Sequence, residues 1–225
     1  QRTTTYAVEN FPSLPDGIMG PELMNKMQAQ AEKFGTRVEF GIEVTDVTKN
    51  DDGTFAVHTK PVFGEEVTVM QTKTVIVASG ATARYLGIEG EEQYIGGRGL
   101  TACAVCDGAF YRDVPVAVIG GGDSACEEAD FLTKYASKVY LVHRRDELRA
   151  SKIMAQRAIN HPKIEMVWNS QLAGYAEADN GNINAIKLTN TVDGTTSELP
   201  VEGVFMAIGH TPNTGFLNTA LVDMY

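Results

Sequence analysis

The sequence predicts an α/β protein of two packed units, and three observations lead to this fold class. A segment with helical periodicity near the start is followed by short runs with the character of strands. Residues 82–99 are rich in glycine and polar residues, as expected of a connection between two units. From residue 114 an apolar strand, a glycine turn, a helix and a second apolar strand follow in turn, which is the pattern of a βαβ unit.

The first expected element is an amphipathic helix that Gly20 and Pro21 open and Gly35 ends. Its apolar residues recur at spacings of three and four, so they share one face of the helix. They are Leu23, Met24, Met27, Ala31 and Phe34.

Strands are expected after this helix. Alternating or apolar runs cover residues 54–59 and 66–70, with Pro61 and Gly64 between them, and they predict two hairpin strands. The fully apolar run 75–78 predicts a buried strand.

The second unit begins with the βαβ pattern and continues with a further helix and three further strands. The expected elements are a strand at 116–119, a glycine turn at 120–122, a helix at 123–134, a strand at 138–142, a helix at about 149–160, and strands at 164–168, 183–189 and 204–208. Strands that alternate with helices predict a parallel sheet.

The composition is ordinary for a globular protein, with 43% hydrophobic and 21% charged residues in a chain of 225. The formal charge is -10 and the pI is about 4.9. Nucleic acid and anionic membranes repel such a protein, so neither is an expected partner. No apolar run approaches the roughly 20 residues that cross a bilayer, and the first residues carry no apolar signal-peptide core.

The three cysteines do not form the dense framework of a small secreted domain, because only two of them are closely spaced, as Cys-x-x-Cys. A reducing compartment and a working thiol pair are the better interpretation. A cytoplasmic location is expected, and an organellar form stays open because the chain begins at Gln1 and not at Met.

A loop of the form G-x-G-x-x-A follows the strand at 116–119 and opens a helix. It consists of Gly120, Gly121, Gly122, Asp123, Ser124 and Ala125. In dinucleotide-binding folds the glycines allow a tight turn and a close approach of the pyrophosphate, and the alanine allows close packing of helix on strand. The helix N-terminus then faces the phosphates. The alternative is a glycine turn in a fold that binds no ligand.

The end of the next strand reads His143, Arg144, Arg145, where a site for NAD usually carries an acidic residue. Guanidinium groups suit a 2′-phosphate, and Arg149 follows one turn later, so NADPH is favoured over NADH. The alternative is a solvated basic cluster that balances the neighbouring acidic residues 146 and 147.

Cys103 and Cys106 have the spacing of dithiol oxidoreductases. One alternative is an inert buried pair, and another is half of a zinc site, which needs two further ligands. The candidates for these ligands are Cys126, His58, His143, His161 and His210.

Asp107 follows the second cysteine and could donate a proton to a leaving thiolate if burial raised its pKa; a role as a helix N-cap is the alternative. Cys126 is interpreted as a packing residue. Electrons pass from a nicotinamide to a disulfide through a mediator, so a flavin is the expected further cofactor.

Several motifs occur together in one order and spacing. They are residues 8–12, 78–81, 102–108, 120–128, 143–146 with 149–151, and 209–214. In this combination the chain resembles, over essentially its whole length, the low-molecular-weight, NADPH-dependent thioredoxin reductases of bacteria, fungi and plants.

The resemblance implies a homodimeric FAD enzyme that reduces thioredoxin. It implies two three-layer, Rossmann-like dinucleotide-binding domains, with the NADPH domain inserted in the FAD domain. The expected limits are 1–84 for the first part of the FAD domain, 85–211 for the NADPH domain with the thiol pair, and 212–225 for the return to the FAD domain. Similar enzymes rotate the NADPH domain about short connections, here near Tyr85 and Thr211.

The resemblance also implies roles for individual residues. Cys106 lies against the flavin, Cys103 exchanges with the thioredoxin disulfide, and Asp107 is the acid. The expected FAD contacts are Gln1, Asn10, Val44, Ser79, Gly80 and Ala81. The expected NADPH contacts are residues 120–125, His143, Arg144, Arg145 and Arg149, and Arg84 is also expected to contact a cofactor.

Two family features are absent. The first G-x-G-x-x-G loop would precede Gln1, and the closing Gly-Asp motif with the last helix would follow Tyr225. The expectation is that this stretch alone binds FAD poorly and turns over weakly or not at all.

Other flavin disulfide reductases, such as the flavoprotein of alkyl hydroperoxide reductase, are the nearest rivals. A ferredoxin-fed relative should lack the arginine cluster. A nucleotide-sensing or zinc-stabilised module without turnover is the rival of a different class.

Overall fold

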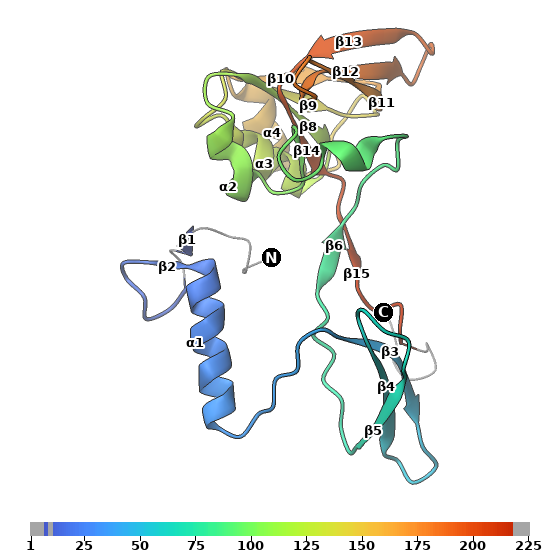
Figure 1. The fold of residues 1–225 in the computed structure, drawn as a ribbon. Helices are drawn as coiled ribbons and strands as arrows, with labels where there is room; N and C mark the ends of the chain where they lie inside the picture. The colour runs from blue at the N-terminus through green and yellow to red at the C-terminus, as the bar shows by residue number, and fades with distance from the viewer. Residues whose placement is uncertain (1–6, 9–10, 218–225) are drawn as a thin grey trace. The chain divides into compact units, whose positions relative to one another are not determined.

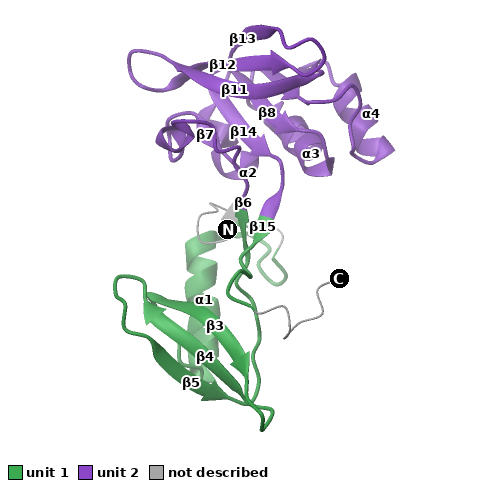
Figure 2. Ribbon diagram, turned by 90° about the vertical axis from the view of Figure 1, so that its right-hand side faces the viewer, with its two compact units in different colours: residues 1–82, 211–225 green, residues 83–210 purple. Residues whose placement is uncertain are grey.

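The structure, a computed structural model, describes residues 7–8 and 11–217. The chain divides into two compact units, residues 1–82 with 211–225 and residues 83–210 (Figure 2). None of the helices in the described residues is long and apolar enough to span a membrane.

The larger unit is built on a five-stranded sheet in the order β10-β9-β8-β14-β7. Figure 1 labels β8, β9, β10 and β14 of this sheet. All four strand pairs are parallel. The strands are β7 (Leu100–Thr101), β8 (Pro115–Gly120), β9 (Lys138–Val142), β10 (Ile164–Val167) and β14 (Gly203–Ala207). The parallel βαβ unit predicted from the sequence is confirmed, because β8 and β9 pair directly on either side of one helix.

Two layers cover this sheet, one on each face. Helices α3 (Asp123–Leu132) and α4 (Lys152–Asn160) pack with Val116 and Val118 of β8. Ala117 and Ile119, which alternate with them along β8, pack with an antiparallel three-stranded sheet. Its strands are β11 (Ser170–Glu177), β12 (Ile183–Asn190) and β13 (Thr196–Pro200). The alternation of side chains along β8 therefore produces a three-layer unit.

Three short helical turns complete this unit. They are η1 (Glu91–Tyr94), α2 (Ala104–Asp107) and η2 (Gly108–Phe110). Ala104 of α2 is fully buried in the cluster that contains Ala125 and Ala129 of α3. The thiol pair therefore lies on a turn that packs against the helix following the glycine loop.

The smaller unit holds the amphipathic helix, which forms as predicted. Its elements are β1 (Ala7–Val8), β2 (Ile18–Met19), α1 (Gly20–Lys33), β3 (Ile42–Lys49), β4 (Phe55–Pro61) and β5 (Thr68–Thr72). Leu23 of α1 packs with Val8 and Ile18, whereas Met27 and Phe34 are exposed.

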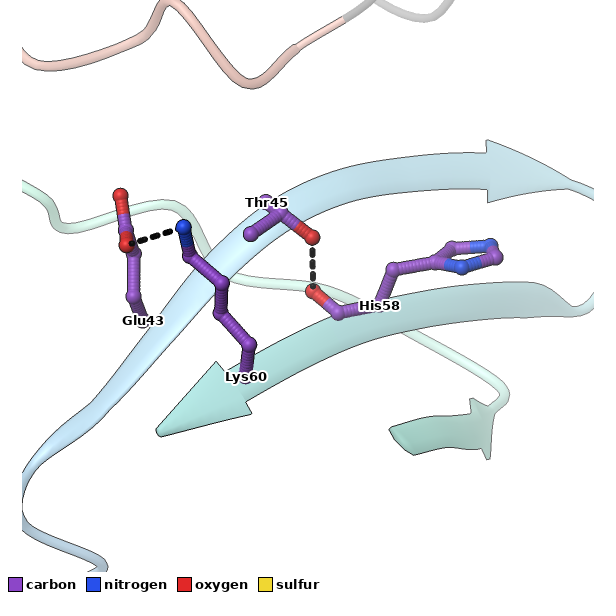
Figure 3. Close-up of polar contacts among 4 residues, drawn as sticks. All are labelled: Glu43, Thr45, His58 and Lys60. Carbon is purple, nitrogen blue, oxygen red and sulfur yellow. Dashed lines mark hydrogen bonds and ion pairs between the residues drawn. The ribbon is translucent and has the colours of Figure 1, made fainter. Parts of the chain in front are cut away.

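The sequence reading missed β3, which pairs with β4. The register shifts between Val44 and Asp46, so Thr45 is an extra residue in the ladder, and its hydroxyl donates to the carbonyl of His58 at 3.3 Å (Figure 3). Nearby, Lys60 pairs with Glu43 at 3.4 Å. The bulge interrupts the alternation of apolar side chains, which explains why the strand was overlooked.

The prediction of a buried strand at residues 75–78 is wrong. The segment has no regular structure, and Ile76 is 92% and Val77 41% exposed. An apolar run becomes a buried strand only where another strand offers hydrogen bonds and a covering layer, and in the described residues β5 pairs with β4 alone.

Two chain passages connect the units, at residues 82–83 and 210–211. They run through β6 (Ala81–Ala83) and β15 (His210–Pro212), which pair with each other (Figure 1). The connections expected from the resemblance lie near Tyr85 and Thr211.

Candidate nucleotide and disulfide sites

A cavity of about 700 Å³ opens in the larger unit where the central strands end. It is lined by Arg84, Leu86, Ile119 to Ser124, Val142, His143, Arg144, Arg149, Ser170 to Leu172, and Ala207 to Gly209. Strands β8, β9 and β14 all contribute their carboxyl ends, which is where open α/β sheets bind ligands.

The glycine loop between β8 and α3 forms the floor of this cavity. A Cβ atom at Gly120 would collide with the carbonyl oxygen of Ala207, and one at Gly121 would collide with the imidazole of His143. A Cβ at Gly122 would meet nothing within 4 Å. The protein's own packing therefore requires the first two glycines, whereas the third leaves open space at the start of α3 for a phosphate group.

The other residues of the motif have different positions. Ser124 lines the cavity. Ala125 is fully buried and does not line it; its Cβ packs against Gly120, as the motif predicts. Asp123 lines the cavity, and its carboxylate accepts a hydrogen bond of 2.8 Å from the Ser151 N–H, which ties α3 to the start of α4.

His143 is 5% exposed at the edge of the cavity, and its Nε2 has no hydrogen-bond partner. Burial lowers the pKa of this imidazole, and the neighbouring Arg149 and Arg145 lower it further, against the effect of hydrogen bonds with the backbone of Glu147 and Gly120. A buried polar atom without a partner fits a site whose ligand supplies one.

The arginines divide into two groups. Arg84, Arg144 and Arg149 line the cavity, and the Arg149 N–H donates to the carbonyl of Gly121 at 2.7 Å. Arg145 is not among the lining residues. In the described part of the chain no ion pair joins these arginines to the acidic residues 146 and 147, and residues 144–147 are exposed.

Cys103 and Cys106 form a disulfide bond, with Cα atoms 5.3 Å apart. Cys103 is the N-cap of α2, and its sulfur accepts a hydrogen bond of 3.2 Å from the Cys106 N–H. Both residues are half-buried, so the pair is not an inert core disulfide.

Asp107 is the last residue of α2, and its side chain caps no helix. Its carboxylate accepts a hydrogen bond from the hydroxyl of Thr101, and that hydroxyl also accepts one of 3.2 Å from the Cys103 N–H. Sequence reasoning missed Thr101, although a threonine two residues before a helix N-cap is a recognisable turn-forming signal.

The third cysteine, Cys126, is buried on α3, in agreement with its interpretation as a packing residue. Burial raises the pKa of its thiol, and the charge of Asp123 contributes. The zinc alternative is not supported, because the sulfurs of Cys103 and Cys106 are bonded to each other and residues 7–8 and 11–217 contain no cluster of three potential ligands.

The residues expected near FAD lie in the smaller unit. Ser79 and Gly80 are exposed in a segment without regular structure, Ala81 is exposed at the start of β6, and Val44 is half-buried on β3. Asn213 holds this segment, because its backbone N–H donates to the Gly80 carbonyl at 2.9 Å and its side-chain amide donates to the Ser79 carbonyl at 3.1 Å. The positions of Gln1 and Asn10 lie outside the described residues.

The two groups of residues expected at cofactor sites therefore differ in their surroundings. The cavity in the larger unit suits a pyridine nucleotide in size, in its open loop at a helix N-terminus and in its arginines. The described residues expected near FAD are exposed at positions 79–81 and half-buried at Val44.

Comparisons with known proteins give the family of this chain. Residues 3–224 match the family model described as pyridine nucleotide-disulphide oxidoreductase. The chain is 48% identical to thioredoxin reductase 1, mitochondrial, of Arabidopsis thaliana, over 97% of this chain and 58% of that protein. It is 47% identical to thioredoxin reductase 1 of Saccharomyces cerevisiae, over 95% of this chain and 66% of that protein.

Solved structures give the same result. The thioredoxin reductase of Lactococcus lactis in the FR conformation is 38% identical with a TM-score of 0.72, over 96% of this chain and 68% of that one. The enzyme of Giardia duodenalis is 38% identical with a TM-score of 0.71, over 100% and 70%. The chain spans 58% of the length of the Arabidopsis relative. It belongs to the pyridine nucleotide-disulphide oxidoreductase family, and within that family it is a homologue of the low-molecular-weight thioredoxin reductases.

Proposed function

We propose that this chain acts in an NADPH-dependent thioredoxin-disulfide reductase, which passes electrons from NADPH through FAD and the Cys103–Cys106 disulfide to oxidised thioredoxin. The observation that carries the proposal is that one compact unit contains both a nucleotide cavity with arginines and a half-buried disulfide. The names of the relatives supply the acceptor.

The larger unit is the proposed NADPH domain, inserted in a FAD domain with limits near residues 84–85 and 211–212. The amides at the start of α3 hold the pyrophosphate, and Gly122 leaves room for it. Arg144 and Arg149 hold the 2′-phosphate. Arg84 contacts the same nucleotide, and Ser79, Gly80 and Ala81 contribute to the FAD surface.

The net reaction transfers two electrons and one proton from NADPH, with one further proton, to the thioredoxin disulfide, which becomes a dithiol. A bound FAD would supply the two-electron chemistry that connects a nicotinamide with a disulfide. The thiolate of Cys103 then attacks the thioredoxin disulfide and forms a mixed disulfide, and the thiolate of Cys106 displaces thioredoxin and restores the Cys103–Cys106 bond.

The local geometry supports these roles. The Cys106 N–H is placed to donate to a thiolate at Cys103, which favours the attacking form. The Asp107 carboxyl supplies a proton to the leaving thiolate of thioredoxin.

The surface around the disulfide supports a protein as acceptor. Val105 within the pair is 66% exposed, and Phe110 just after it is 71% exposed. Exposed apolar side chains beside a reactive group are typical of a docking surface. A homodimer in the cytoplasm or in an organelle completes the proposal.

Turnover tests the proposal. The chain, supplied with FAD, NADPH and oxidised thioredoxin, should generate thioredoxin thiols faster with NADPH than with NADH. Reduction of a peroxiredoxin-type disulfide but not of thioredoxin would transfer the assignment to the alkyl hydroperoxide reductase flavoproteins, and zinc bound in place of the disulfide would contradict any redox role.

A further inference from the structure

The edge of the parallel sheet leads directly into the thiol pair. Thr101 is the last residue of β7, and its Cα is in register with that of Phe205 on β14, a fully buried residue. The sheet therefore fixes the backbone of Thr101 two residues before Cys103.

The hydroxyl of Thr101 makes two hydrogen bonds of opposite sense. It accepts from the Cys103 N–H at 3.2 Å, so its own proton is available for the carboxylate of Asp107, to which it donates. The Asp107 N–H donates in turn to the Cys103 carbonyl at 3.1 Å. Backbone and side chain of Asp107 are thus both held, the first by Cys103 and the second by Thr101.

We propose that Thr101 is a positioning residue, which holds the Asp107 carboxyl beside the thiol pair for proton transfer. The inference rests on the acid role proposed for Asp107. Asp107 is half-buried and lies at the end of a helix of four residues. Without the Thr101 hydroxyl, its carboxylate would rotate toward water.

The contact is suited to a group that gains and loses a proton. A threonine oxygen has two lone pairs, of which the Cys103 N–H uses one. An ionised Asp107 accepts from the hydroxyl, and a protonated Asp107 can donate to the second lone pair. The same two residues therefore remain joined in both protonation states.

The test uses the 225-residue chain without FAD, NADPH or thioredoxin. The pair is reduced, and its rate of alkylation by iodoacetamide is measured from pH 5 to pH 10 for the wild type, Thr101→Val, Thr101→Ser, Asp107→Asn and the double variant Thr101→Val with Asp107→Asn. Thr133→Val is the matched control, because Thr133 is also half-buried and its hydroxyl donates to the Asp130 carbonyl.

A carboxylate held beside a thiol opposes its ionisation, so Asp107→Asn should move the alkylation midpoint down by about one pH unit. Thr101→Val should move it in the same direction by roughly half a unit, because the released carboxylate is screened by water. Thr101→Ser and Thr133→Val should match the wild type, and the double variant should match Asp107→Asn alone.

A wild-type midpoint for Thr101→Val would overturn the inference, and so would a shift of equal size with and without Asp107. If Thr101→Val does not unfold cooperatively, Thr101→Ala provides the same comparison. The assay contains no electron donor or acceptor protein, so failure of the proposed reductase activity would leave its result intact, and a negative result here would not remove that activity.

Discussion

The proposed nucleotide cavity and the thiol pair both adjoin the five-stranded parallel sheet. Different contacts fix the residues of each. The cavity lies at the ends of the central strands β8, β9 and β14, where glycine backbone packs against His143 and Ala207. The thiol pair follows the edge strand β7 and is held by the hydroxyl of Thr101. Changes at Gly120 and Gly121 should therefore affect folding as well as binding, whereas changes at the thiol pair should affect chemistry alone.

The largest expected effect is a loss of turnover without a loss of stability. Cys106→Ser should lower thioredoxin reduction by at least about 10³-fold, because no disulfide can form with Cys103. Affinity for NADP⁺ and, under reducing conditions, the thermal midpoint should not change. Cys126→Ala is the control and should retain turnover, since Cys126 lies on α3 away from the pair in sequence and is not disulfide-bonded. Normal turnover by Cys106→Ser would refute the role of the pair.

The glycine loop should show the opposite behaviour. Gly121→Ala brings a methyl group into the imidazole of His143 and should lower the free energy of unfolding by about 1–3 kcal/mol, measured by urea denaturation without nucleotide. Gly122→Ala, whose methyl group meets open space, should be close to the wild type in stability but weaker in NADP⁺ binding. Wild-type stability of Gly121→Ala would remove the distinction between the two regions.

Glu128 on α3 should make the stability of the chain depend on pH. Burial raises the pKa of its carboxyl to about 7, and the charge of Glu127 adds to the effect. Because the pKa in the folded chain is higher than in the unfolded chain, stability is lost as the pH rises from about 4.5 through 7.

Glu128→Gln should therefore stabilise the chain by about 2 kcal/mol at pH 8 and have little effect at pH 4, as measured by denaturant unfolding at each pH. The exposed neighbour provides the control, because Glu127→Gln should have a smaller effect at pH 8. A stabilisation that is independent of pH would contradict the titration of Glu128.

The smallest effect concerns cofactor choice. Arg149→Ala should weaken NADPH binding roughly tenfold and leave NADH binding nearly unchanged, since a 2′-phosphate would lose one charged partner. Arg145→Ala is a matched control, because Arg145 does not line the cavity. Calorimetric titration of both nucleotides would show the difference, and an equal loss of NADPH and NADH affinity in Arg149→Ala would place the 2′-phosphate away from Arg149.

Regions that a local sequence motif specifies were predicted correctly. The glycine loop and the parallel β8-α3-β9 unit were predicted because a local motif specifies their backbone. Arg144 and Arg149 were grouped with Arg145 because spacing along the chain does not reveal which side chains line a cavity.

Elements that depend on distant partners were harder to predict. β3 was missed because of its bulge at Thr45, and the apolar run 75–78 was assigned to a strand for which the described residues provide no partner. Thr101 was missed because its importance lies in two side-chain contacts, which hydrophobic periodicity does not show.

The route of electrons can be tested most directly by counting thiols in a single turnover. The chain is mixed anaerobically with excess FAD and limiting NADPH, and free thiols are alkylated and located by mass spectrometry. The proposed function predicts two new thiols, at Cys103 and Cys106, for each NADPH oxidised. Oxidation of NADPH while the Cys103–Cys106 disulfide stays intact would contradict it.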